Sequence, residues 1–104
     1  MMAASRHQLL DDALAMSRRM ASLGDAGDWE GVIELEPQRR MLLEKAFATH
    51  APVDELVADR VRAILDLDKR LMAQSIEARD RIAEELSLTG KGRKAASAYQ
   101  AAGR

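Results

Sequence analysis

Apolar residues in the first part of the chain recur at alternating steps of four and three positions. This spacing places their side chains on one stripe of an α-helix. The residues are Leu9, Ala13, Met16, Met20 and Leu23. Ser5 can cap the start of such a helix, and the glycines and aspartates of residues 24–28 are typical of a turn. The pattern therefore predicts a helix over residues 5–23.

A second helical pattern begins at Asp28, a residue type that caps helix starts. It ends at the turn formed by residues 49–52. Pro37 lies inside this pattern and has no backbone N–H, so we expect it to kink the helix or to separate a short first turn. The apolar residues fall on two stripes, which are Trp29, Ile33, Leu43 and Phe47, and Val32, Leu35, Leu42 and Ala46.

The third helical pattern is the longest and runs to about Leu88, and either Asp54 or the preceding turn caps its start. At 1.5 Å per residue it predicts a rod of roughly 50 Å, whereas the first two helices would each span about 30 Å. Two short helices cannot cover the long one, so its apolar residues from Leu71 to Leu86 need another partner. That partner could be a second copy, the chain's own tail or a different protein, and a homodimer stays open.

We therefore predict an all-α fold in which residues 1–89 form an antiparallel bundle of three helices. Residues 90–104 would form a basic tail that is flexible or conditionally helical. Aromatic residues make up only 3% of the 104, which argues against an all-β fold. No run of about 18 apolar residues exists, and the N-terminus lacks the apolar core of a signal peptide. A cytoplasmic protein without a membrane partner is the expectation.

Charge is distributed unevenly along the chain. Residues 1–89 contain 12 basic and 17 acidic residues, whereas residues 90–104 contain four basic residues and no acidic one. An acidic body opposes direct binding of nucleic acid, and no basic recognition helix is apparent. We therefore expect no nucleic-acid partner.

Residues that could carry catalysis are not grouped in the sequence. There is no cysteine, and His7 and His50 lie far apart, with His7 expected to be solvated in the first turn of its helix. No nucleotide-binding or hydrolase motif occurs. We predict a protein that is not an enzyme and that has no catalytic residue, cofactor or metal site.

Charged residues interrupt the apolar stripes of the second and third helices. Arg39, Arg40 and Asp68 occupy positions where apolar side chains would be expected. A charge inside a bundle is costly without a partner, and a polar pair there fixes the register of the helices. We assign Glu36, Arg40 and Asp68 to a structural ion pair.

Several short motifs follow one another along nearly the whole chain. Asp28-Trp29-Glu30 opens the second helix, and a turn containing Pro52 precedes the third. The other motifs are Glu36 with Arg39-Arg40, Leu42-Leu43, Ile64-Leu65-Asp66-Leu67-Asp68 with Leu71, and Gly90-Lys91-Gly92-Arg93-Lys94-Ala95-Ala96-Ser97-Ala98-Tyr99. In this order and at this length they resemble the FliT family of bacterial flagellar export chaperones.

The resemblance implies an all-helical cytoplasmic chaperone of the flagellar type III secretion system. Such a protein holds the filament-cap protein before export and delivers it to the export gate and its ATPase complex. Some members of the family also bind the flagellar master transcriptional regulator.

Helical geometry, rather than matched family positions, selects the residues that we expect to contact a partner. Apolar residues at the edge of the long helix suit an amphipathic helix from a client protein. The apolar contacts are Leu42, Leu65, Met72, Ile76 and Leu86, and the tail contributes Lys94 and Tyr99.

Two other interpretations remain open at this point. One is a structural helical-bundle dimer without a client, in which self-association covers all apolar surface of the third helix. The other is a small regulator that sequesters a transcription factor, or that binds nucleic acid through its tail.

Overall fold

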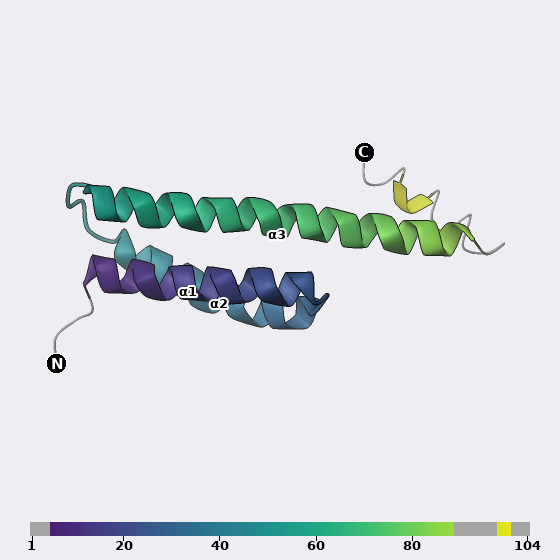
Figure 1. The fold of residues 1–104 in the computed structure, drawn as a ribbon. Helices are drawn as coiled ribbons and strands as arrows, with labels where there is room; N and C mark the ends of the chain where they lie inside the picture. Colours follow the sequence, from purple (N-terminus) through teal and green to yellow (C-terminus); the bar gives the residue numbers. More distant parts are fainter. Residues whose placement is uncertain (1–4, 89–97, 101–104) are drawn as a thin grey trace. The chain divides into compact units, whose positions relative to one another are not determined.

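The computed structural model describes residues 5–88 and 98–100, and these contain helices but no strand. The helices are α1 (Arg6–Asp25), α2 (Trp29–Ala46) and α3 (Glu55–Ser87), as Figure 1 shows. The prediction of an all-α fold with a long third helix is confirmed. The chain divides into two compact units, Met1–Met72 and Ala73–Arg104. The boundary predicted between residues 89 and 90 lies outside the described residues.

Each of the three helices begins at a cap residue that the sequence predicts, and for the third helix this is Asp54 rather than the preceding turn. In each case a side-chain oxygen accepts a hydrogen bond from the backbone N–H three residues later, which satisfies a donor that the helix itself cannot pair. The acceptors are Ser5 Oγ, Asp28 Oδ1 and Asp54 Oδ1, which lie 3.1, 3.0 and 2.8 Å from the respective nitrogen atoms.

Helix α2 continues through Pro37 as one element, so the predicted separation of a short first turn does not occur. A proline cannot donate to the carbonyl four residues earlier, which here is that of Ile33. Ile33 lies on the exposed side of α2. Water can therefore solvate the freed carbonyl, and this makes the proline tolerable inside the helix.

Two apolar clusters hold the unit Met1–Met72 together. Leu10, Ala46 and Val57 form one cluster, and Ala13, Leu14 and Ile64 form the other. Contacts between α1 and α3 advance in the same chain direction, so these two helices run parallel within the unit. Helix α2 connects them and runs antiparallel to both (Figure 1).

The turn between α1 and α2 depends on two glycines. Gly27 has a φ angle of 74°, a backbone conformation that costs glycine little. A Cβ atom on Gly31 would lie 3.0 Å from Leu23 Cδ1. The absence of a side chain at Gly31 therefore lets the end of α1 pack against the start of α2.

Candidate functional site

The first part of the candidate surface lies on α3 within the unit Met1–Met72. Ile64 is buried between the helices, whereas Leu65 and Met72 are 52% and 66% exposed. Leu65 and Met72 are seven residues, or about two turns, apart and therefore lie on one side of the helix. This side of α3 carries large apolar groups that the unit itself does not bury.

Leu42 differs from the other predicted contacts. It is partly buried and packs against the cluster of Ala13, Leu14 and Ile64. Most of its side chain therefore serves the fold, and only a part faces solvent.

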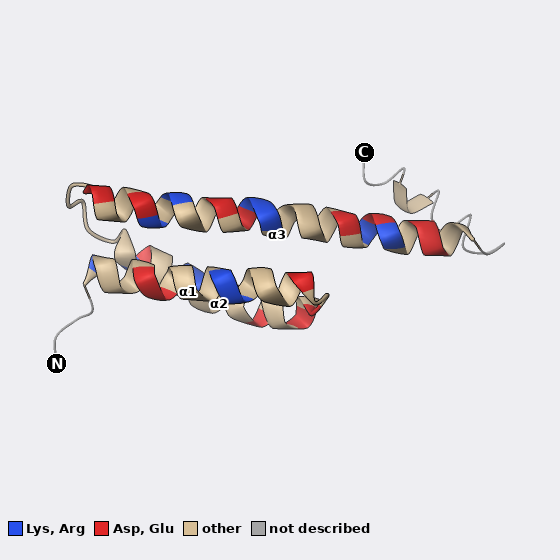
Figure 2. Cartoon of the chain, viewed as in Figure 1, with Lys and Arg blue, Asp and Glu red and all other residues tan. Residues whose placement is uncertain are grey.

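The second part lies on α3 within the unit Ala73–Arg104. Among the described residues of this unit, Ala83 is the buried apolar residue, while Ile76, Ile82 and Leu86 are all at least 40% exposed. Charged residues of both signs are interspersed with uncharged residues along α3 (Figure 2). In this unit, α3 therefore exposes apolar side chains that are surrounded by charged residues.

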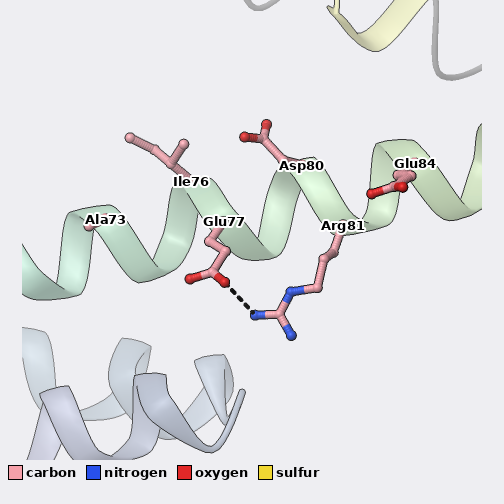
Figure 3. Close-up of a pocket in the computed structure, with 6 residues that line it drawn as sticks. All are labelled: Ala73, Ile76, Glu77, Asp80, Arg81 and Glu84. Carbon is pink, nitrogen blue, oxygen red and sulfur yellow. Dashed lines mark ion pairs between the residues drawn. The ribbon is translucent and has the colours of Figure 1, made fainter.

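A hollow of about 470 Å³ lies beside this part of α3. Its lining consists of Ala73, Ile76, Glu77, Asp80, Arg81 and Glu84. Figure 3 shows Ile76 and Asp80 on one side of the helix, and Glu77 and Arg81 on the other. Sites for small molecules are mostly apolar, and only one large apolar side chain lines this hollow. The lining suits contact with a protein segment better than enclosure of a cofactor.

The two predicted tail residues differ in how far the structure describes them. Lys94 lies outside the described residues. Tyr99 is described and is 49% exposed.

The charged residues within the bundle pair differently from the predicted set. Asp68 accepts a hydrogen bond from Arg39, and the same guanidinium donates to Ser17 Oγ at 3.2 Å. Arg40 instead lies on the outside of α2, 3.0 Å from Glu36 on the same helix. Arg39 therefore connects α2 with α1 and α3, whereas Arg40 and Glu36 stay within α2.

Arg6 holds the loop between α2 and α3, a role that the sequence analysis missed. Its guanidinium donates to the carbonyl oxygens of Ala46 and Thr49 at 2.9 Å and of Ala51 at 3.0 Å. The same group lies 5.7 Å from the ring centre of Phe47. One signal was present in the sequence: a basic residue in the first turn of a helix is unfavourable there, which suggests a partner elsewhere.

His7 contacts the other end of the same loop, where α3 begins. Its Nε2 atom lies 2.9 Å from Asp54 Oδ2, so the side chain is not simply solvated as predicted. The pKa of Asp54 is lowered from its ordinary value of 3.8, first because the backbone N–H of Val57 donates to the carboxylate and then because of His7. The stability from this ionised carboxylate is therefore present above that value and is lost as the pH falls through the lowered pKa.

The described residues carry neither a metal-binding cluster nor a membrane span. Within residues 5–88 and 98–100, no three His, Asp or Glu side chains are grouped to hold a metal ion. None of the helices in this part of the chain is long and apolar enough to cross a membrane.

Comparison with known proteins gives one match, to a protein family. The family described as "Flagellar protein FliT" matches residues 7–101, which is most of the chain. No curated protein and no solved structure gives a significant match. The resemblance inferred from the sequence motifs is confirmed. The chain belongs to the FliT family, a family of flagellar export chaperones.

Proposed function

We propose that this chain is a cytoplasmic chaperone that binds the filament-cap protein of the flagellum before export. It delivers this client to the export gate and its ATPase complex. The observation that carries the proposal is the set of exposed apolar side chains on α3, which are Leu65, Met72, Ile76 and Leu86. Family membership supports the general role.

The chemistry of the surface fits the capture of a helix. An amphipathic client helix places apolar residues at every third or fourth position, and such residues can contact Leu65 and Met72 in the unit Met1–Met72. In the unit Ala73–Arg104, Ile76 provides the same kind of apolar contact. Methionine adapts its shape to different partners because its side chain is unbranched and flexible. Binding of this kind covers aggregation-prone surface of the client and requires no bond to be made or broken.

The test is co-purification with the C-terminal helical region of the filament-cap protein from the same organism. The Met72→Glu, Ile76→Glu variant places two charges on the proposed surface. The matched control is Val53→Glu, Leu56→Glu, because its residues are 62% and 47% exposed, against 66% and 45% for Met72 and Ile76. We expect the first variant to lose the complex and the control to retain it.

Each other outcome has a definite meaning. If the Met72→Glu, Ile76→Glu variant still forms the complex, the proposed function stands but the client does not bind at this surface of α3. The absence of any complex, together with a tight dimer in light scattering, supports the structural dimer instead. Equal loss in both variants would show that added negative charge, rather than this surface, controls binding.

A further inference from the structure

The outer face of α2 carries a second line of exposed apolar residues. Ile33, Pro37 and Met41 recur every four positions, and Ile33 and Met41 are 70% and 53% exposed. Val32 and Ala46, on the inner side of α2, are buried. All of α2 lies in the unit Met1–Met72, and this line lies on a different helix from Leu65 and Met72, the client contacts that α3 contributes to the same unit.

Three carboxylates border this line. Glu30, Glu34 and Glu44 are exposed, and on a helix they lie beside Ile33, Pro37 and Met41. None of the three has an ion-pair partner within the residues that the structure describes. We call these six residues the outer α2 face.

The basic residues of α2 do not neutralise these carboxylates. Arg39 points inward to Asp68, and Arg40 is occupied by Glu36. Lys45 lies in the last turn of α2, at one end of the face. The outer α2 face therefore carries a net negative charge around an apolar line.

Pro37 adds a further acceptor in the middle of the face. Because proline has no backbone N–H, the carbonyl oxygen of Ile33 receives no hydrogen bond from position 37. Ile33 and Pro37 are both exposed, so this turn of α2 lies at the surface, where another molecule can approach it. A lysine or arginine side chain would provide such a donor.

We propose that the outer α2 face binds a positively charged amphipathic helix of another protein. Apolar residues of that helix pack on Ile33 and Met41. Its lysine or arginine side chains pair with the three carboxylates and donate to the Ile33 carbonyl. The interaction is a second docking site and does not depend on the client proposed for α3.

The charge and composition of the chain argue for this occupant over two others. A second copy docking through the same face would place Glu30, Glu34 and Glu44 against their own counterparts, which is repulsive. The chain's own basic segment, residues 90–104, has Tyr99 as its one large apolar residue and so offers little to pack on both Ile33 and Met41.

The experiment uses the full chain and a synthetic fluorescent peptide. The peptide consists of leucine and lysine placed to form an amphipathic helix of about 18 residues, or five turns. A second peptide carries glutamate in place of each lysine. Fluorescence anisotropy should show binding of the lysine peptide at least about tenfold tighter than of the glutamate peptide, because only the former complements the carboxylates.

Two variants of equal charge locate the site. Glu30→Lys, Glu34→Lys, Glu44→Lys should weaken binding of the lysine peptide at least about tenfold, since three attractions become repulsions. The matched control is Glu55→Lys, Asp59→Lys, Glu85→Lys, which changes net charge equally at exposed positions of α3 outside the hollow and should alter the affinity less than about threefold. If circular dichroism shows that the α2 variant loses helix, Ile33→Ser, Met41→Ser replaces it and should weaken binding to a similar extent.

Pro37→Ala separates the binding role of the carbonyl from its structural effect. Alanine restores the N–H and should raise the thermal unfolding midpoint, because proline is the poorest residue in a helix interior. The same substitution should weaken peptide binding about two- to threefold, since the Ile33 carbonyl is then already paired. Higher stability with unchanged binding would remove the carbonyl from the site.

Four results would overturn the proposal. The first is no binding of the lysine peptide, and the second is equal weakening by the α2 variant and its α3 control. The third is a native dimer in sedimentation that only the α2 variant dissociates, since a second copy would then occupy the face. The fourth is binding that appears only when Lys91, Arg93 and Lys94 are replaced by glutamate, since the chain's own segment would then be the occupant.

Discussion

A single side chain, Arg6, provides much of the polar contact that closes the bundle. The last carbonyl groups of a helix have no intrahelical donor, and the planar guanidinium reaches that of Ala46 together with two carbonyls of the following loop. Its charge lies at the C-terminal end of α2, where the helix dipole favours a cation. An arginine that is unfavourable for its own helix thus stabilises the next one.

Replacement of Arg6 should therefore lower the stability of the fold. We expect Arg6→Ala to reduce the free energy of unfolding by about 1–3 kcal/mol, because carbonyls at the end of α2 lose a charged donor. The free energy of unfolding of Arg6→Lys should lie between those of the unaltered chain and Arg6→Ala, since an ammonium group cannot span several carbonyls. Urea unfolding measures both variants. Arg18→Ala, an exposed arginine on the same helix, is the control, and an equal effect there would contradict the assigned role.

At the scale of elements, one ion pair joins α2 to α3. The Arg39 side chain is 13% exposed and the Asp68 side chain 38%, whereas Arg40 and Glu36 are 59% and 44% exposed. Loss of a partner is costly for a mostly buried guanidinium and nearly neutral for a solvated one. The two adjacent arginines therefore contribute very differently.

We expect Asp68→Ala to cost about 1–2 kcal/mol of unfolding free energy, less than for a fully buried pair because solvent reaches the carboxylate. Glu36→Ala should cost about 0.5 kcal/mol or less, as for other pairs four residues apart on a helix. Urea unfolding of both variants gives the comparison. An equal cost for the two would show that Asp68 has no special role in joining α2 and α3.

The difference between Arg39 and Arg40 shows what the sequence pattern could not determine. Consecutive residues point about 100° apart on a helix, so one arginine of the pair must point further inward than the other. The apolar residues of α2 form two stripes, and this breadth leaves its rotation about the axis undetermined. Packing against Ser17 on α1 selects Arg39.

At the scale of the whole chain, apolar burial differs sharply between the two units. Among the described residues, nine of the ten buried hydrophobic residues lie in Met1–Met72, and the tenth is Ala83. Regions with little buried apolar surface open at low free energy. The two units should therefore differ in local stability.

Hydrogen exchange followed by mass spectrometry measures this difference. We expect amides in residues 76–86 to exchange at least about tenfold faster than those in residues 57–64, although both segments belong to α3. Addition of the client should slow exchange in residues 76–86 if the proposed surface binds it. Equal protection of the two segments in the free chain would contradict the expected difference.

The sequence by itself determined the helices, their cap residues and the family, because these depend on local spacing, local hydrogen bonds and motif order. It also identified Leu65, Met72 and Ile76 as apolar positions that a bundle with two short helices leaves available for a partner. Only the tertiary structure decided which arginine faces inward, that Arg6 and His7 hold the loop between α2 and α3, and that α2 tolerates Pro37. These features depend on how each helix is rotated and on which side meets solvent, and contacts between residues distant in sequence fix both.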